Sequence, residues 1–405
     1  MKRLDVAIAG CGPAGLAAAL FLDRIGCRVS LFDQFEAPQP VGSGLLLQPT
    51  GLIVLDALGL RDRIKTLGQP ISRLLGHSAP RGRIALDVRF GNLPDKAQAL
   101  AVHRSALFNV LFDAVSAHEI DITTGARLEK VDTHGDGRPT LVTETGRRHG
   151  PFDLLIDATG ARSSIRASTS AEPKITPLKY GALWATVDWD PNGPFQPDVL
   201  AQRYQRASRM VGVLPVGRRS EGGEPVATFF WSLKAQDYDA WRNRGLDAWR
   251  EDVAAIWPDC APLVEQVTDP DQLTLARYAH FTLKQPILPR IAFVGDSAHA
   301  TSPQLGQGAN MALLDAMALA RALEHSASIE QSLQDYAAAR RRHVRLYQAM
   351  SSVFTPVFQS DSYILPLLRD WFSAPMTRVP GVPRLLAEIV AGRLIDPLAA
   401  MPDAP

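Results

Sequence analysis

The 405-residue sequence has few cysteines, almost no net charge and no long apolar segment. Three cysteines are too few and too widely spaced for a disulfide framework or a zinc cluster, which predicts a reducing compartment and no metal site. Lys and Arg total 43 and Asp and Glu 42, so the net charge of +1 gives no overall attraction to nucleic acid. Glycines interrupt the apolar residues 4–22, and no segment approaches the roughly 20 apolar residues of a transmembrane helix. We therefore expect a cytoplasmic protein.

The start of the chain has the pattern of a βαβ unit. Residues 4–9 (LDVAIA) and 28–33 (RVSLFD) predict buried parallel strands, and the alanine-rich segment between them predicts a helix that ends near Gly26. Later segments predict further helices, a β-hairpin and buried strands: helices over 58–64, 104–118 and 308–324, the hairpin over 125–150, and strands over 152–160 and 290–296. The length corresponds to roughly two to three domains.

A glycine motif joins the first strand to the first helix. It reads GCGPAG and comprises Gly10, Gly12, Pro13, Ala14 and Gly15. Glycines at this spacing allow a tight turn, close approach of the backbone to a pyrophosphate, and close packing of helix on strand. Asp33 ends the second strand, where a carboxylate accepts hydrogen bonds from ribose hydroxyls. The motif predicts an ADP-bearing dinucleotide and leaves open whether it is NAD or FAD.

A second glycine motif lies almost three hundred residues later. The end of the strand 290–296 and the second loop, which leads into a helix, contain its residues: Gly295, Asp296, Pro303, Gly306, Gly308, Ala309 and Asn310. Asp296 is placed to bind ribityl hydroxyls, and the amides of the helix N-terminus are placed to meet the pyrimidine edge of an isoalloxazine. FAD needs such a second site and NAD does not, so the sequence favours FAD.

The middle and C-terminal regions have a different character. Between about 178 and 234 three strand-like segments occur, and six of the seven tryptophans lie between 184 and 257. They either line an aromatic pocket or fill a core between sheet and helices. The segment 346–372 has apolar residues at helical spacing, which either packs against the enzyme or forms a surface for a membrane or a partner. We expect the neighbouring basic run 340–343 to be a solvated helix face.

From residue 4 to about 345 the chain resembles the FAD-dependent aromatic hydroxylases, the single-component flavoprotein monooxygenases similar to para-hydroxybenzoate hydroxylase and the ubiquinone-biosynthesis hydroxylases. Both glycine motifs match that family, Arg104 in LAVHRSAL matches its cofactor-binding arginine, and residues 41–51 with Gly44 match its loop beside the flavin. The resemblance implies hydroxylation of an aromatic or quinone-like small molecule by O2 through a flavin C4a-hydroperoxide, with NAD(P)H as reductant. One departure is Thr159, which stands where the family usually has an aspartate linked to NAD(P)H use, with Asp157 two residues earlier.

No set of catalytic side chains stands out, as expected where a flavin supplies the chemistry. His299 and Tyr204 are weak catalytic candidates, and Tyr180 and His280 are weaker still. The fold expected is α/β, with a Rossmann-like FAD-binding domain, an inserted mostly β substrate domain and C-terminal helices. The FAD domain is expected to comprise 1–75, 100–175 and 275–345, the substrate domain 76–99 and 176–274, and the helical segment 346–405.

Two alternatives to this function remain open. One is a reductase, oxidase or halogenase of the same fold, and the other is a flavin-binding protein without catalytic activity. The partners expected are a small aromatic substrate and O2 without nucleic acid, in a monomer or dimer, with peripheral membrane contact left open.

Overall fold

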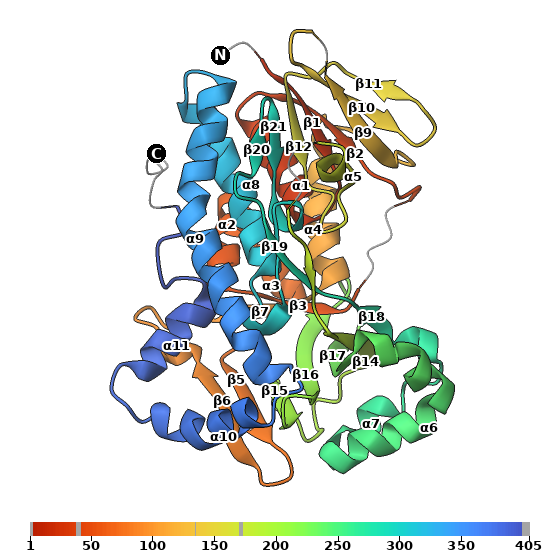
Figure 1. Ribbon diagram of the computed structural model, residues 1–405, viewed down its shortest axis with the longest axis vertical. Helices are drawn as coiled ribbons and strands as arrows, with labels where there is room; N and C mark the ends of the chain where they lie inside the picture. Colours follow the sequence, from red (N-terminus) through yellow and green to blue (C-terminus); the bar gives the residue numbers. More distant parts are fainter. Residues whose placement is uncertain (1–2, 38–41, 134, 170–172, 399–405) are drawn as a thin grey trace.

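The computed structural model describes residues 3–37, 42–133, 135–169 and 173–398. Figure 1 shows two sheets at opposite ends of an elongated molecule, with long helices beside the upper sheet. The α/β fold class is confirmed, with a parallel sheet for the dinucleotide and a largely antiparallel second sheet.

The upper sheet has the strand order β20-β21-β12-β1-β2-β8. Its strands are β1 (Asp5–Ala9), β2 (Arg28–Phe32), β8 (Asp121–Thr123), β12 (Leu154–Asp157), β20 (Ile287–Leu288) and β21 (Ile291–Phe293). Pairing is parallel from β21 to β8, and Ala9 lies beside both Phe32 and Asp157, which in turn pairs with Phe293. Four strands therefore end at one level, where the carboxyl edge of a parallel sheet receives ligands.

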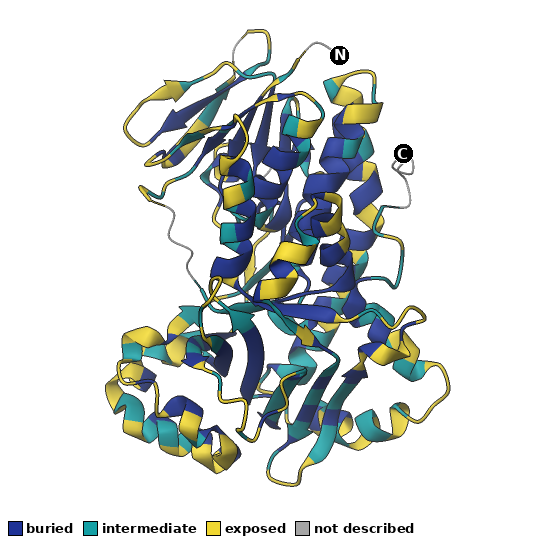
Figure 2. Ribbon diagram, turned by 180° about the vertical axis from the view of Figure 1, so that it is seen from behind, coloured by how far each residue is buried: buried dark blue, intermediate teal, exposed yellow. Residues whose placement is uncertain are grey.

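Helices cover this sheet because small apolar residues let them approach closely. The helices of this half of the molecule are α1 (Pro13–Arg24), α2 (Pro49–Ala57), α3 (Arg61–Leu67), α4 (Arg104–Ser116), α5 (Ser164–Ala167), α8 (Gly308–His325) and α9 (Ile329–Phe358). Helices α1 and α8 pack against each other, and most residues of both are buried, as the dark ribbons of Figure 2 show. Helix α2 was missed by the sequence analysis because residues 41–51 were interpreted as a loop, and the helix predicted over 58–64 is α3, which begins only at Arg61.

Three small antiparallel sheets complete the fold. One consists of β9 (Leu128–Thr133), β10 (Pro139–Thr143) and β11 (Arg148–His149), which confirms the predicted hairpin region. A second, which we call the small sheet, consists of β3 (Gly44–Leu47), β4 (Gln69–Ile71) and β7 (Ala99–His103). It lies between the two large sheets. A third pairs β13 (Thr176–Pro177) and β22 (His299–Ala300) with β19 (Ala279–Thr282).

The lower sheet has the order β18-β14-β17-β16-β15-β5-β6. Its strands are β5 (Arg73–Ser78), β6 (Arg83–Arg89), β14 (Tyr180–Asp188), β15 (Val199–Gln205), β16 (Arg209–Arg218), β17 (Pro225–Lys234) and β18 (Thr274–Ala276). Helices α6 (Tyr238–Ile256) and α7 (Ala261–Val264) pack on it and enclose the buried Trp231, Trp241, Trp249 and Trp257. For these four tryptophans the core interpretation is right and the pocket interpretation is wrong.

The chain ends in α10 (Ile364–Met376) and α11 (Val382–Ala391), which pack against β6. Among the described residues, no helix combines the length and the hydropathy needed to cross a bilayer.

Candidate flavin site

The three turns that the sequence analysis singled out lie together at the carboxyl edge of the upper sheet. Gly10 follows β1, Thr159 lies just beyond β12, and Gly295 follows β21 after one residue. Adding a Cβ to Gly10 would place it 2.6 Å from the Ala158 carbonyl oxygen, and one on Gly295 would lie 3.5 Å from the Ala14 Cβ. The fold thus brings two glycine loops almost three hundred residues apart into contact.

The first loop has the shape of a phosphate cradle. Gly10 has φ of 100°, a conformation that favours glycine, and a Cβ on Gly15 would lie 1.9 Å from the Gly10 carbonyl oxygen. Both glycines are therefore required by the fold itself. A Cβ on Gly12 would meet no protein atom within 4 Å, and Gly12 and Pro13 begin α1, where a helix leaves the amides of its first turn without acceptors.

Asp33 is half-buried beside this loop. Its Oδ2 accepts a hydrogen bond from the Cys11 amide at 2.6 Å, and its Oδ1 accepts one from the Phe35 amide at 3.2 Å. Each carboxylate oxygen has a second lone pair for a ribose hydroxyl. Asp33 therefore fixes the loop and still presents acceptors at the strand end where the sequence analysis expects the adenosine ribose.

The second loop is attached to the buried middle of α8. The Gly295 amide donates to Asp315 Oδ2 at 2.8 Å, and φ of 61° at Gly295 turns the chain so that Asp296 points outward. The Asp296 carboxyl is exposed, although the protein around it desolvates it and raises its pKa. A Cβ on Gly308 would lie 4.0 Å from Asp296 Oδ1, so the start of α8 and this carboxyl face one space.

The N-terminus of α8 combines free amides with a structural side chain. Gly308, Ala309 and Asn310 form the first turn, whose amides have no acceptor within the helix. The Asn310 side chain is fully buried: its Oδ1 accepts from the Gln48 amide at 2.8 Å, and its Nδ2 donates to the Leu46 carbonyl at 3.0 Å. Only the backbone of Asn310 is left to meet a ligand. Pro303 begins the short turn before α8, and Gly306 ends it with φ of 61°.

Arg104 and Gly44 border the same region from the small sheet. Arg104 begins α4, its side chain is exposed, and it passes over Gly42, where a Cβ would lie 2.7 Å from the Arg104 Cδ. Its charge acts on both Asp296 and Tyr278. The Gly44 amide donates to Thr228 Oγ1 at 2.7 Å and so joins this loop to the lower sheet. Val41, the first residue of the loop predicted beside the flavin, lies outside the described residues.

The turn that departs from the family pattern is closed on itself. Asp157 is fully buried and accepts hydrogen bonds from the Thr159 amide at 2.9 Å, the Thr159 hydroxyl at 2.6 Å and the Ser163 hydroxyl. Burial raises the pKa of Asp157, and these hydrogen bonds oppose that rise. Asp157 holds the turn together and does not replace the family's aspartate at an accessible position.

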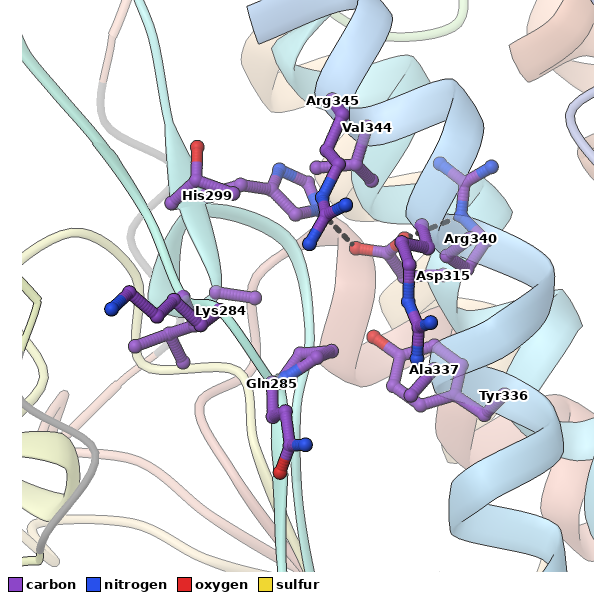
Figure 3. A pocket seen from close by; sticks show the side chains of 14 residues that line it. Lys284, Gln285, His299, Asp315, Tyr336, Ala337, Arg340, Val344 and Arg345 are labelled. Carbon is purple, nitrogen blue, oxygen red and sulfur yellow. Dashed lines mark hydrogen bonds and ion pairs between the residues drawn. The ribbon is translucent and has the colours of Figure 1, made fainter.

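His299 belongs to a buried charge cluster behind the second loop. Figure 3 shows His299 and Arg340 approaching Asp315 from opposite sides, with 2.7 Å from His299 Nε2 to Oδ2 and 2.7 Å from Arg340 Nε to Oδ1. Burial acts to raise the pKa of Asp315, but His299 and Arg340 outweigh it and hold the value at about 2. The cleft drawn there lies between residues 282–286 and α9, and Asp296 does not line it. This placement favours a supporting role for His299.

The same cluster corrects the expectation for the basic run 340–343. Arg340 and His343 are buried, with His343 Nε2 placed 3.0 Å from the Gly392 carbonyl oxygen, and only Arg341 and Arg342 are exposed. An isolated basic run in a sequence does not show which of its members has an acidic partner on another helix.

Aromatic side chains in and beside the lower sheet approach the candidate flavin site near Arg104. The Trp184 indole donates to the Tyr278 hydroxyl at 2.9 Å and packs on Phe230, with ring centroids 4.7 Å apart. Both Trp184 and Tyr278 are half-buried, and burial raises the pKa of Tyr278 to about 12. The sequence analysis missed Tyr278, which lies in the turn between β18 and β19; its position shortly before the second motif was the available signal.

The other weak candidates are engaged within the protein. Tyr204 is buried and donates to Gln202 Oε1 at 2.8 Å, and Tyr180 donates to Asp361 Oδ1 at 2.7 Å. The half-buried His280 lies 3.4 Å from the Thr301 hydroxyl through its Nδ1. Catalytic roles for Tyr204 and His299 stay predictions, and the described residues contain no group of His, Cys, Asp and Glu arranged to hold a metal ion.

The open space at Gly12, the free amides at two helix N-termini, the accessible Asp296 and the positive charge of Arg104 suit a ligand with a pyrophosphate and two polyhydroxyl segments, such as FAD. Fold and site together define a flavin-binding oxidoreductase with a Rossmann-like domain.

Residues 3–350 match the model of the FAD binding domain family, so the chain belongs to that family. Among curated proteins it is 27% identical to the aurachin C monooxygenase/isomerase of Stigmatella aurantiaca, over 83% of this chain and 85% of that one. It is 25% identical to an FAD-dependent urate hydroxylase of Klebsiella pneumoniae, over 84% of this chain and 86% of that one. These matches place the chain among FAD-dependent monooxygenases and hydroxylases.

Solved structures share the fold. A tetrameric 2-methyl-3-hydroxypyridine-5-carboxylic acid oxygenase has a TM-score of 0.77 at 22% identity, covering 91% of this chain and 96% of that chain. A Klebsiella pneumoniae protein in complex with FAD and uric acid has a TM-score of 0.79 at 20% identity, covering 98% and 97%.

Proposed function

We propose that the protein is an FAD-dependent monooxygenase that uses NAD(P)H and O2 to hydroxylate an aromatic or quinone-like small molecule. The contact between Trp184 and Tyr278 carries this proposal, because it places aromatic surface of the lower sheet within reach of the charge of Arg104, which borders the flavin site. The family supports the cofactor, and the relatives' names support the reaction class.

The flavin, when bound, supplies the electron transfer and the oxygen chemistry that no side chain of this chain supplies. The chain's own residues bind and orient. Gly12 and the start of α1 hold the pyrophosphate, Asp33 and Asp296 accept hydrogen bonds from hydroxyl groups, and the start of α8 offers amides to an electron-rich ring edge.

The substrate side is aromatic and carries few charges. The half-buried Trp184 and Tyr278 offer aromatic surface backed by the buried Phe230, and the Tyr278 phenol, with its pKa raised by burial, is a protonated hydrogen-bond donor at neutral pH. A flat aromatic ring suits such a surface. One curated relative is named a putative 2-heptyl-3-hydroxy-4(1H)-quinolone synthase, an activity on a ring of this kind.

Purified protein loaded with FAD is tested with candidate aromatic substrates, NADH or NADPH, and O2. We expect substrate-stimulated NAD(P)H oxidation and a product heavier by one oxygen atom. The variant Trp184→Ala should raise KM for the aromatic substrate while FAD content stays unchanged, with Trp189→Ala, a half-buried tryptophan just past the end of the same strand, as the matched control. Product heavier by two hydrogens or a halogen, or bound FAD without any turnover, contradicts the proposal and favours the alternatives.

A further inference from the structure

Helix α10 exposes its apolar side. Its accessible residues are Ile364 (68% exposed), Leu367 (56%), Leu368 (48%), Trp371 (61%), Phe372 (60%) and Met376 (46%). They recur at three- and four-residue intervals, so they form one continuous stripe along the helix. Val379 and Leu385 extend it toward α11. We call these eight residues the α10 stripe.

The rotation of α10 about its axis is fixed by a buried arginine. Arg369 donates to the carbonyl oxygens of Val357 and Arg206 at 3.2 and 3.0 Å, and its guanidinium lies 4.6 Å from the centre of the Tyr204 ring. Only Pro366 and Arg369 of the helix are buried. Turning the stripe inward would remove Arg369 from these acceptors, so the stripe faces outward because the polar side of α10 is anchored.

Arginines without acidic partners border the stripe. The guanidinium of Arg83 lies 4.3 Å from the centre of the Trp371 ring, and that of Arg206 lies 4.7 Å from the centre of the exposed Tyr363 ring. Arg378 is exposed one residue before Val379. Within the described parts of the chain, none of these three arginines forms an ion pair with an acidic residue.

We propose that the α10 stripe is a docking surface for an anionic lipid bilayer, independent of the flavin chemistry. Exposed tryptophan and tyrosine rings with arginines at their edges suit the boundary between headgroups and acyl chains, where rings are buried and guanidinium groups reach phosphates. The 13 residues of α10 are too few to span a bilayer, so the helix lies along its surface.

A second copy of this chain is a poorer fit to the same surface. A two-fold contact would place the stripe against itself and bring Arg83, Arg206 and Arg378 of both copies toward one another without acidic partners. Phosphates of an anionic lipid layer neutralise these charges instead. Figure 1 shows α10 at the end of the molecule away from the six-stranded sheet, so docking leaves the glycine loops uncovered.

The test is flotation of the full-length, FAD-loaded protein with vesicles of phosphatidylcholine, with and without phosphatidylglycerol. We expect binding to the anionic vesicles, weaker binding to phosphatidylcholine alone, and loss of part of the affinity at high salt. Trp371 is the only exposed tryptophan of the seven, so its emission should shift to the blue on binding.

Matched variants make the result specific. Trp371→Ser and Phe372→Ser should each weaken vesicle binding by about tenfold, since each removes one large side chain from the lipid. Arg378→Gln should weaken binding to anionic vesicles only. Ile53→Ser removes an apolar side chain that is 47% exposed on α2 and should change nothing.

Three results overturn the proposal. These are absence of binding to both kinds of vesicle, equal flotation of Trp371→Ser and the unmodified protein, and a dimer that Trp371→Ser dissociates, as measured by light scattering. The last result makes the stripe an interface between copies. Because the assay measures binding without turnover, its failure leaves the proposed monooxygenase reaction untouched.

Discussion

His103 Nε2 lies 3.1 Å from the Thr186 hydroxyl and so joins the small sheet beside the flavin site to the lower sheet. His103 is paired with Gly44 across β3 and β7, and Thr186 is paired with Thr228 across β14 and β17. Since Gly44 also donates to Thr228, two neighbouring residues of one sheet bond to two neighbouring residues of the other. Arg104 follows His103 directly, so these bonds set its position between the two sheets.

Thr186→Val keeps the shape of the side chain and removes its hydrogen bond to His103. We expect a loss of about 1 kcal/mol in the free energy of unfolding, because His103 Nε2 would be left without its partner. Urea unfolding measures it, and Thr274→Val, at an exposed position on β18, is the control with no expected change. Equal stability of both variants would show that the bond contributes nothing.

Mild acid should destabilise the fold through His103. Burial, with the charges of Arg219 and Arg104, lowers its pKa to about 4, and burial lowers that of His343 to about 3. In the unfolded chain both protonate near 6.5, so the unfolded state binds more protons, and stability present above pH 6.5 is lost as the pH falls toward 4. For His103 alone the loss is about 3 kcal/mol. His103→Gln should flatten the measured dependence, and an unchanged slope would contradict this assignment.

Gly12→Val should separate flavin binding from folding. Its Cβ meets no protein atom, so we expect an unchanged melting temperature without FAD and a loss of the 450 nm absorbance of bound flavin. Gly91→Val, also in open space but far along the chain, should keep its flavin. Normal flavin content in Gly12→Val would place the pyrophosphate elsewhere.

Arg104→Gln should weaken FAD binding by about tenfold or more, because one charge-assisted contact is lost. Its guanidinium makes no ion pair with the described residues, so the stability of the flavin-free protein should change little. Titration with FAD measures the affinity, and Arg147→Gln on the exposed hairpin is the control. A drop in stability without a change in affinity would make Arg104 a structural residue.

Arg340→Met should destabilise the protein by about 3 to 5 kcal/mol, since it removes the guanidinium and leaves the fully buried Asp315 with the His299 imidazole as its one side-chain partner. Arg341→Met removes the exposed neighbouring arginine and should stay within about 0.5 kcal/mol of the unmodified protein. Similar losses of unfolding free energy in both variants would show that the buried ion pair between Arg340 and Asp315 contributes no more to stability than an exposed arginine does.

The two glycine motifs were predictable from the sequence because their constraints are local. Gly10 needs a positive φ, Gly15 has no room for a Cβ, and a helix begins immediately after, all within six residues. The strands on either side are continuous apolar runs, as in any sheet buried on both faces. The same reasoning located α8 to within a residue of its observed end.

Tertiary structure alone decided what surrounds those motifs. Asp315, Arg340 and His299 come from three separate elements, Tyr278 meets Trp184 from a turn more than ninety residues later in the chain, and α10 faces outward because Arg369 finds acceptors on two other segments. None of these partners has a fixed spacing in the sequence. Backbone conformation depends on neighbours in the chain, whereas burial and charge pairing depend on neighbours in space, and only the folded chain supplies those.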